Sequence, residues 1–511
     1  MSTNRAHGGD PMDWFDAAGA THYRRLFAST PAGRRLLYAD MLSETARIAA
    51  ALAQCGVQPG ERVLCRIEKS LDAVLLYLAC LRYGAVFVPV NPAATPAEFD
   101  YLLRDAQPRL IVLDPHAGPE VAAVVAGAPS LTLAADGTGS LAELAERSAP
   151  LALEHAAAAV AGAVAAIVYT SGTTGRPKGA MLTRANLASN AGALARAWRF
   201  VPDDVLLHVL PLFHVHGLFV ALNTVLASGA SLVLQAKFEP QAALAALEEA
   251  TVFMGVPTLY TRLLKEPGLD RRSTARVRLF VSGSAPLPAE THREFERRTG
   301  HTILERYGMT ETLMISSNPY DGPRLPGSVG PPLEGVAVRV TDAGGAAQPQ
   351  GVVGGFEVRG PAVFAGYWRD AHKTQAQFTA DGWFRTGDVG RLDEAGYLWI
   401  LGRAKDLVIS GGYNVYPKEV ESELDAVAGV AESAVFGVPH PDYGEAVTAA
   451  VVAEAGAALA EADLIEAVRS RLSAYKVPKR VLLVPELPRN AMGKVRKELL
   501  RESYAKLYQP H

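Results

Sequence analysis

The feature that most constrains this chain is a repeated alternation of short apolar runs with helix-like segments over its first 320 residues. Helical spacing of apolar residues is found, for example, at 42–55 and 71–81. Strands that alternate with helices pair in parallel and carry helices on the faces of their sheet. The sequence therefore predicts an α/β fold with a large N-terminal domain of parallel sheets flanked by helices. The runs typical of buried strands are residues 62–67, 85–90, 110–113, 163–169, 206–210, 231–234, 252–255 and 279–282.

The pattern changes after Gly327. Short strands separated by glycine turns follow, which predicts an antiparallel, barrel-like subdomain over about 328–402. From residue 406 onward, two helical segments and three strands predict a smaller α/β unit. We therefore expect two domains, residues 1–404 and 405–511, with the boundary at Lys405.

Composition excludes several classes of protein. The 511 residues carry a formal net charge of −3, and nucleic-acid binding needs clustered positive charge, so we expect no nucleic-acid partner. Three cysteines without a Cys-x-x-Cys pair exclude a disulfide framework and a cysteine-ligated zinc site. Aspartates among the first 16 residues exclude a secretory signal, and no apolar run is long enough for a membrane span. A cytoplasmic protein without a membrane partner is expected.

The strongest local motif is a glycine-rich loop at residues 169–179, Tyr-Thr-Ser-Gly-Thr-Thr-Gly-Arg-Pro-Lys-Gly, between a predicted buried strand and a predicted helix. Small residues let backbone N–H groups face outward, hydroxyls add donors, and Lys178 adds a cation. Such a nest of donors suits a polyphosphate. It lacks the Gly-Lys-[Ser/Thr] ending of a Walker A loop and the dinucleotide fingerprint. The expected phosphate-binding residues are Thr170, Ser171, Gly172, Thr173, Thr174, Gly175 and Lys178.

This loop resembles the phosphate loop of the AMP-forming acyl-adenylate synthetases, which include the acyl-CoA synthetases. Five further motifs occur in that superfamily's order, so the resemblance spans nearly the whole chain. It implies an acid–thiol ligase with ATP and coenzyme A as co-substrates and Mg²⁺ as cofactor. A carboxylate would attack the α-phosphate of ATP, and a thiol would then displace AMP. The five motifs are residues 307–312, 383–388, 402–406, 410–417 and 488–494.

The resemblance also implies roles for single residues on the nucleotide side. Glu311 matches the magnesium ligand, and Thr310 would contact the α-phosphate. Asp388 matches the acid that accepts hydrogen bonds from both ribose hydroxyls, and its two oxygens suit a vicinal diol. Arg403 would contact ribose or phosphate. Tyr307 would stack on adenine, beside Gly308 and Met309.

The C-terminal motifs imply a moving domain. Lys494 matches a lysine that contacts the attacking carboxylate and the α-phosphate region during adenylation. Lys405 falls at the hinge about which a mobile C-terminal domain would rotate. That rotation would remove Lys494 and present Ser410, Gly411, Gly412 and Tyr413 to the thiol. One departure is Gly355, where relatives usually carry glutamate after the preceding glycine.

The choice of acid must come from the acyl pocket, for which segments 211–217, 254–262 and 279–286 are candidates. An apolar pocket would suit a long chain, whereas these segments and the loop carry charged or titratable side chains. A second carboxylate on the substrate would need a buried cation, because an unpaired buried charge is very costly. With residues 305–322 they look most like malonyl-CoA synthetases, which implies malonate, with methylmalonate as a second acid. The expected acyl-site residues are Arg176, Lys178, His214 and Ser282, with Arg262 as the partner of the distal carboxylate and Met309 limiting the size of the pocket.

Other functions were weighed on the same residues. Another short-chain acyl-CoA synthetase, or a ligase that loads the phosphopantetheine of a carrier protein, stays open because both acceptors share one thiol end. A serine hydrolase is disfavoured by the absence of Gly-x-Ser-x-Gly. A non-catalytic nucleotide-binding module is disfavoured by the presence of Glu311, Asp388 and Lys494 together. A metal pair at His214 and His216 lacks a third clustered ligand, and a position in the core is expected for His208.

Overall fold

Four β-sheets organise the computed structural model, which describes residues 10–152, 162–170, 177–490 and 493–509. The first large sheet has the order β17-β8-β7-β4-β3-β5-β6, in which β7, β4, β3, β5 and β6 are parallel and β8 and β17 form an antiparallel edge. Its strands are β3 (Arg62–Arg66), β4 (Val86–Pro89), β5 (Leu110–Leu113), β6 (Ser130–Thr132), β7 (Val164–Thr170), β8 (Lys178–Thr183) and β17 (Gly366–Tyr367).

The second large sheet has eight strands in the order β14-β13-β12-β11-β9-β10-β1-β2. The six inner strands are parallel, and β14 and β2 are antiparallel edges. Both large sheets confirm the predicted α/β fold. The strands are β1 (Leu26–Ser29), β2 (Arg35–Leu37), β9 (Val205–His208), β10 (Ser231–Leu234), β11 (Val252–Gly255), β12 (Leu279–Ser282), β13 (Leu304–Met309) and β14 (Leu313–Ser317).

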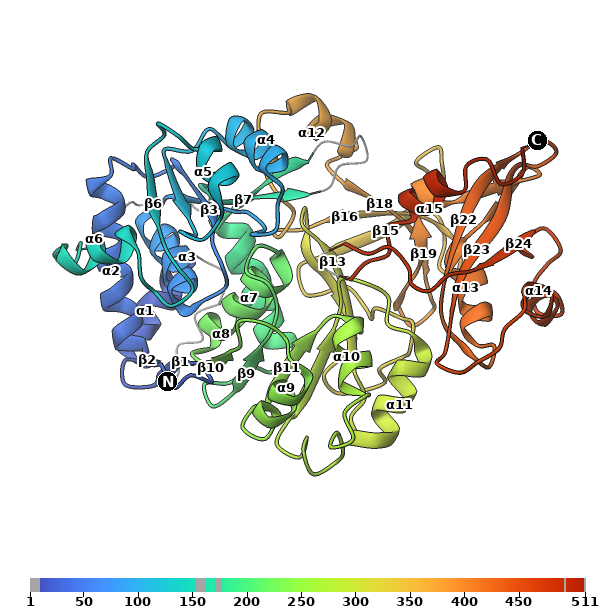
Figure 1. The fold of residues 1–511 in the computed structure, drawn as a ribbon, viewed down its shortest axis with the longest axis horizontal. Helices are drawn as coiled ribbons and strands as arrows, with labels where there is room; N and C mark the ends of the chain where they lie inside the picture. Colours follow the sequence, from blue (N-terminus) through green and yellow to red (C-terminus); the bar gives the residue numbers. More distant parts are fainter. Residues whose placement is uncertain (1–9, 153–161, 171–176, 491–492, 510–511) are drawn as a thin grey trace.

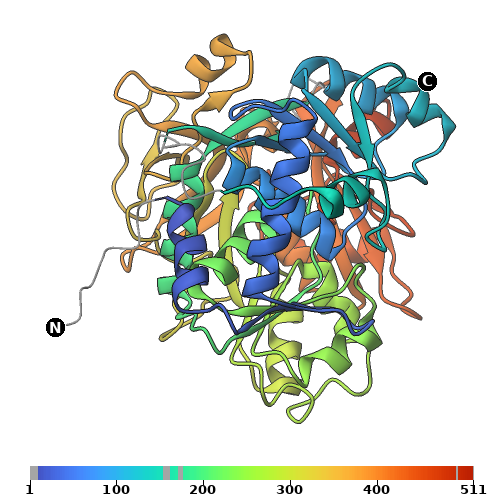
Figure 2. The same cartoon turned by 90° about the vertical axis from the view of Figure 1, so that its left-hand side faces the viewer.

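Helices pack between and around these sheets. Helix α7 packs against β8 of one sheet and β14 of the other, so it lies between them (Figure 1). Helix α3 is buried on nearly every side, as expected of a helix between layers. Helices α1 and α2 lie at the end of the molecule farthest from the C-terminal unit (Figure 2). The helices are α1 (Met12–Ala20), α2 (Tyr38–Gln54), α3 (Leu71–Tyr83), α4 (Pro96–Ala106), α5 (Pro119–Val124), α6 (Ser140–Arg147), α7 (Arg184–Ala197), the π-helix η1 (His216–Ala221), α8 (Leu222–Ser228), α9 (Pro240–Leu247), α10 (Pro257–Leu263) and α11 (Ala289–Thr299).

Local sequence explains where α7 begins. The Thr183 side chain accepts a hydrogen bond from the Asn186 amide, and the Asn186 side chain accepts one from the Thr183 amide in return. This reciprocal cap fixes the start of the helix directly after β8. Strands β7 and β8, which flank the glycine-rich segment in the sequence, pair with each other as far as Thr170 and Lys178.

A four-stranded antiparallel sheet follows, in the order β15-β16-β18-β19, with β15 and β19 at its edges. Its residues are those predicted to form the antiparallel subdomain, and the sheet borders the C-terminal unit (Figure 1). Its elements are β15 (Ala337–Thr341), β16 (Gly354–Arg359), α12 (Ala371–Gln377), β18 (Phe384–Leu392) and β19 (Leu398–Arg403).

The last unit begins after a single 3-10 turn, η2 (Ala404–Asp406). Its sheet has the order β21-β20-β23-β22, with β24 paired to β23, and its core clusters contain only residues from Val408 onward. No helix in the described part of the chain is long and apolar enough to cross a membrane. The elements are β20 (Val408–Ser410), β21 (Tyr413–Val415), α13 (Pro417–Asp425), β22 (Val430–His440), β23 (Gly444–Ala453), α14 (Glu461–Arg469), β24 (Arg480–Leu483) and α15 (Lys497–Ser503).

Candidate active site

Three residues from separate predicted motifs meet where the large N-terminal part borders the C-terminal unit. The Tyr307 hydroxyl donates a hydrogen bond to Oδ2 of Asp388, and Nε of Arg403 lies 2.8 Å from Oδ1 of the same carboxylate. Residue alternation along β18 turns Thr386 and Asp388 inward and Arg385 outward, which aims this carboxylate at the site. All three side chains were predicted as nucleotide contacts, and the fold brings them together.

Lys494 comes from the C-terminal unit to the same place. Lys494 as a whole is exposed, so the burial that acts on it is that of the ammonium end of its side chain among the groups of the site. Its ammonium faces Arg403, Asp388 and Asp406, and burial followed by repulsion from Arg403 lowers the pKa of Lys494 to about 8. Gly493, the residue before it, lies against α10, since a Cβ on Gly493 would be 3.0 Å from Oγ1 of Thr258. The described residues thus place the predicted C-terminal lysine beside the predicted ribose-binding acid.

A second group of polar side chains surrounds Glu311. The Tyr367 hydroxyl donates to Oε1 of Glu311 over 2.9 Å, and the Lys178 ammonium lies 5.1 Å from the centre of the Tyr367 ring. Both Glu311 and its neighbour Thr310 are buried. This arrangement gathers a carboxylate, a hydroxyl and a cation at the β8 end of the glycine-rich segment.

Parts of the predicted phosphate loop fall outside the described residues. These are Ser171, Gly172, Thr173, Thr174, Gly175 and Arg176. Thr170 and Lys178 face each other in the register of β7 and β8, so the two ends of the loop are fixed. Gly308 and Met309 end β13, opposite Met314 and Leu313 of β14.

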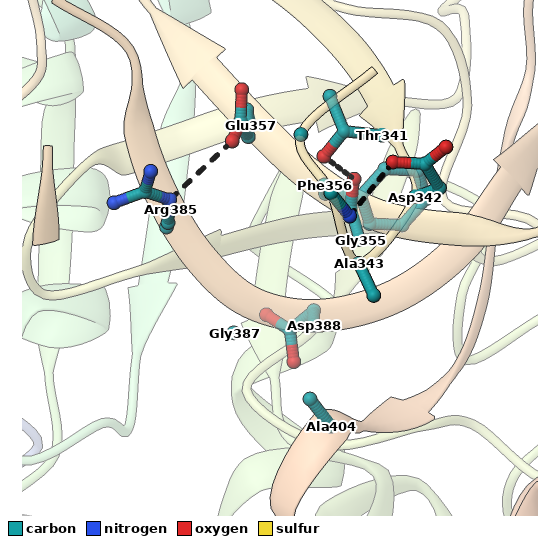
Figure 3. A pocket seen from close by; sticks show the side chains of 12 residues that line it. Thr341, Asp342, Ala343, Gly355, Phe356, Glu357, Arg385, Gly387, Asp388 and Ala404 are labelled. Atoms are coloured by element: carbon teal, nitrogen blue, oxygen red, sulfur yellow. Dashed lines mark hydrogen bonds and ion pairs between the residues drawn. The ribbon is translucent and has the colours of Figure 1, made fainter. Parts of the chain in front are cut away.

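A pocket of about 270 Å³ opens beside Asp388 (Figure 3). Gly355 and Gly387 line it, and Ala404 of the η2 turn closes one side. Arg385 and Glu357 form an ion pair of 3.6 Å at its edge. Gly355, which carries no side chain, thus lines the same pocket as the predicted ribose-binding acid.

The most unusual electrostatic feature is a buried guanidinium on β13, that of Arg306, the residue before Tyr307. The Arg306 side chain on β13 is 4% exposed, and its Nε and Nη2 atoms have no hydrogen-bond partner among the described residues. Burial lowers the pKa of Arg306 to about 9. Within the described ranges this buried guanidinium forms no ion pair.

Two histidine side chains lie close enough to this guanidinium for its charge to act on them. Burial and the Arg306 charge lower the pKa of His214 to about 4, and they lower that of His216 well below its usual value. Nδ1 of His216 lies 3.2 Å from Oγ of Ser284, while its Nε2 and the hydroxyl of Ser282 have no partner among the described residues. Buried polar groups normally find partners, so the unsatisfied atoms of Arg306 and His216 indicate a polar ligand.

The structure does not place Arg262 in this cluster. It projects from α10 as an exposed side chain and stacks over Phe238, with its guanidinium carbon 4.9 Å from the ring centre. Arg306, by contrast, is a cation that the structure buries. The signal for it was the charged pair Glu305 and Arg306 immediately before the Tyr-Gly of a recognised motif.

His214 and His216, the two histidines considered as a metal pair, are hydrogen-bonded to each other. The amide of His216 donates to Nδ1 of His214 over 3.3 Å. The prediction for His208 is confirmed, because it is buried and its Nε2 lies 2.9 Å from the carbonyl oxygen of Gly217. No group of three or more acidic, histidine or cysteine residues in the described ranges could hold a metal ion alone.

The predicted hinge and thiol-facing residues lie on η2 and the following hairpin. Lys405 is exposed in the middle of the 3-10 turn. Ser410 is buried and paired in register with Tyr413, while Gly411 and Gly412 form the turn between them with φ of 58° and 82°. Tyr413 is 60% exposed and stacks on Tyr475 with ring centres 4.8 Å apart.

Comparison with known proteins identifies relatives along nearly the whole chain. The family described as AMP-binding enzyme matches residues 15–368, and the AMP-binding enzyme C-terminal domain matches residues 419–494. The mitochondrial malonate–CoA ligase of Mus musculus is 39% identical over 484 residues, covering 87% of this chain and 82% of that protein. An indoleacetate–CoA ligase of Aromatoleum aromaticum is 36% identical, covering 93% of this chain and 94% of that protein.

Solved structures of similar proteins match this chain over almost its full length. The crystal structure of ATP-bound MatB from Rhodopseudomonas palustris is 50% identical, with a TM-score of 0.94 over 98% of this chain and 100% of that one. The apo crystal structure of the same MatB gives a TM-score of 0.83 over the same shares of both chains.

Proposed function

Because the chain belongs to the AMP-binding enzyme family, we propose that it is an ATP-dependent malonate–CoA ligase. One carboxylate of malonate attacks the α-phosphorus of ATP, which forms malonyl-AMP and releases pyrophosphate. The thiol sulfur of coenzyme A then attacks the malonyl carbonyl carbon, and AMP leaves. Methylmalonate is proposed as a second acid.

The observation that carries the choice of acid is the buried, unpaired guanidinium of Arg306. A dicarboxylate brings the negative charge that this cation lacks, and an arginine fork can hold a carboxylate through two N–H groups. A monocarboxylate would leave both the guanidinium and its hydrogen-bond donors unsatisfied, which is the kind of mismatch that gives strong discrimination. Nε2 of His216, a residue on which the Arg306 charge acts, is a further polar atom without a partner among the described residues.

On the nucleotide side, Asp388 would take the ribose hydroxyls, with Tyr307 and Arg403 holding its carboxylate in place. The glycine-rich segment that ends at Lys178 would hold the phosphates. Family members of known structure with ATP bound, such as MatB at 50% identity, support this assignment.

Glu311 fits the magnesium ligand expected of the family. It is a hard oxygen donor, it is buried, and no larger acidic cluster surrounds it within the described residues. Such a site suits an ion shared with substrate phosphates rather than one held by protein ligands alone. Bound there, Mg²⁺ would neutralise phosphate charge as the carboxylate approaches.

Lys494 is proposed as the catalytic cation of the adenylation step. Its ammonium lies beside Asp388 and Arg403, where the α-phosphate would be, and a flexible point charge can follow the charge that develops there. The higher TM-score with ATP-bound than with apo MatB supports the view that this domain arrangement serves the ATP-dependent step.

For thioester formation we propose that residues 405–511 rotate about Lys405. The separate core of this unit and the single turn at η2 support a boundary there. Rotation would withdraw Lys494 and bring Ser410, Gly411, Gly412 and Tyr413 to the coenzyme A thiol. A carrier-protein phosphopantetheine is the alternative acceptor. The three unpaired cysteine thiols favour a cytoplasmic setting.

The test is a panel of acids assayed for AMP formation with ATP, Mg²⁺ and coenzyme A. Malonate is expected to exceed acetate, propionate, butyrate and benzoate by about 100-fold or more in kcat/KM. Replacing coenzyme A with a phosphopantetheinylated carrier protein distinguishes the two acceptors. A preference for a monocarboxylate would leave the adenylation chemistry intact and contradict the assignment of malonate.

A further inference from the structure

Gly283 stands directly against the guanidinium of Arg306. Strands β12 and β13 are parallel neighbours, and Ser282 lies opposite Glu305. The residues that follow these two, Gly283 and Arg306, therefore lie side by side. A Cβ built on Gly283 would be 2.4 Å from Cζ, 2.5 Å from Nε and 2.6 Å from Nη1 of Arg306. The guanidinium thus occupies the place of the missing side chain.

The backbone conformation of Gly283 does not require glycine. Its φ is not positive, so an L-residue can adopt the same backbone conformation there. The atoms that a methyl group would meet belong to the end of a flexible side chain, not to backbone. An alanine can therefore be accommodated by displacing the guanidinium, and no hydrogen bond holds Nε or Nη2 against that displacement within the described chain.

We propose that Gly283 is a specificity-determining position: its missing side chain fixes where the Arg306 guanidinium meets the distal carboxylate of the substrate. The inference rests on the proposed function and adds to it a residue that does not touch the acid. Recognition of a carboxylate by a guanidinium depends on geometry, and small misplacements in a site cost large factors in rate. Gly283 therefore acts through Arg306 as a positioning residue.

The experiment is a double-mutant cycle with four proteins: wild type, Gly283→Ala, Arg306→Ala and Gly283→Ala/Arg306→Ala. For each, kcat/KM is measured with malonate and with propionate. Gly283→Ala is expected to lower the malonate value about tenfold or more and to leave propionate within about threefold. In the Arg306→Ala background the methyl group has room, so Gly283→Ala is expected to change either value by less than about threefold.

Gly19→Ala, on α1, is the matched control, because a Cβ at Gly19 would contact only Cδ1 of Leu42, at an ordinary distance of 3.8 Å. The Gly19→Ala variant is expected to have the same kcat/KM as wild type with malonate and with propionate. ATP binding, measured by calorimetry without acid, is expected to be equal in all five proteins. If Gly283→Ala lowers malonate use equally with and without Arg306, or lowers propionate use to the same extent, the proposal is overturned.

Folding gives a further readout. If Gly283→Ala alone is unstable and the double variant is stable, the steric relation to Arg306 is supported; instability in both backgrounds overturns it. Failure of the proposed function looks different, because then the wild type itself prefers propionate or Arg306→Ala leaves malonate use unchanged.

Discussion

The Tyr367 hydroxyl donates a hydrogen bond to Oε1 of Glu311 over 2.9 Å, inside a site where both side chains are buried. Tyr367 sits on β17 at the edge of one large sheet, and Glu311 lies in the turn between β13 and β14 of the other. The bond therefore ties the proposed magnesium ligand to the opposite half of the N-terminal domain. Orientation of a ligating carboxylate by a second residue tunes its affinity for metal.

Tyr367→Phe is expected to raise the Mg²⁺ concentration for half-maximal activity by about tenfold, because a hydrogen bond to a charged group contributes about 1.5–3 kcal/mol. The measurement is a magnesium titration of AMP formation, with calorimetric binding of ATP at two magnesium concentrations beside it. Tyr397→Phe, which loses only an exposed hydrogen bond to the Pro323 carbonyl, is the control. A magnesium dependence unchanged from wild type would contradict a role for Tyr367 in positioning Glu311.

Lys494 is expected to give the adenylation step an alkaline limit. Its pKa is lowered to about 8, so above that pH the ammonium loses its proton and with it the charge that assists attack. Malonate-dependent release of pyrophosphate, measured without coenzyme A, should fall as pH rises through 8. The rate at which the malonyl group is transferred from synthetic malonyl-AMP to coenzyme A, corrected for hydrolysis of malonyl-AMP, should not show this decline.

Two substitutions isolate that effect. Lys494→Ala should abolish adenylation and leave ATP binding largely intact. Lys494→Arg keeps its charge at every pH, so whatever rate it retains should lack the decline above pH 8. An unchanged alkaline decline in the arginine variant would assign it to another group.

Glu305 is expected to make the N-terminal domain less stable as pH rises. Burial raises the pKa of Glu305 to about 7, against the opposing influence of backbone N–H groups of Gly327 and Leu287 and the charge of Lys418. The folded protein thus holds a proton between about pH 4.5 and 7 that the unfolded chain releases, so the free energy of unfolding falls across this range. Above pH 7 the loss is on the order of 3 kcal/mol.

Glu305→Gln removes this charge and keeps an acceptor for the Gly327 amide. It should unfold at a higher temperature than wild type at pH 8, and the difference should shrink toward pH 5. Glu249→Gln, at an exposed position, is the control and should match wild type at both values. A constant difference between variant and wild type across the pH range would contradict the raised pKa.

Much of this architecture follows from sequence because each strand and helix carries its own local signal. The parallel strands from β3 to β12 and the cap at Thr183 are examples, since apolar runs and capping residues act over a few positions. The meeting of Tyr307, Asp388 and Arg403 was predicted only through recognised motifs. Nothing local to these segments shows that they converge.

The acyl pocket was harder because it depends on packing between distant segments. Arg262 was expected inside, but α10 has only seven residues, too few to define a buried face by periodicity, and it buries Leu259, Tyr260 and Leu263 instead. Arg306 is buried because Gly283 on the neighbouring strand leaves room for it. That relation depends on strand register, which the separate segments do not reveal.

The central claim is that Arg306 recognises the second carboxylate of malonate, and the ratio of kcat/KM for malonate to that for propionate tests it most directly. Wild type should favour malonate, and Arg306→Ala should lower the ratio by about 100-fold or more, because an unpaired carboxylate would then be buried. ATP affinity, measured without acid, should remain that of wild type. A ratio that stays the same in Arg306→Ala would contradict the account.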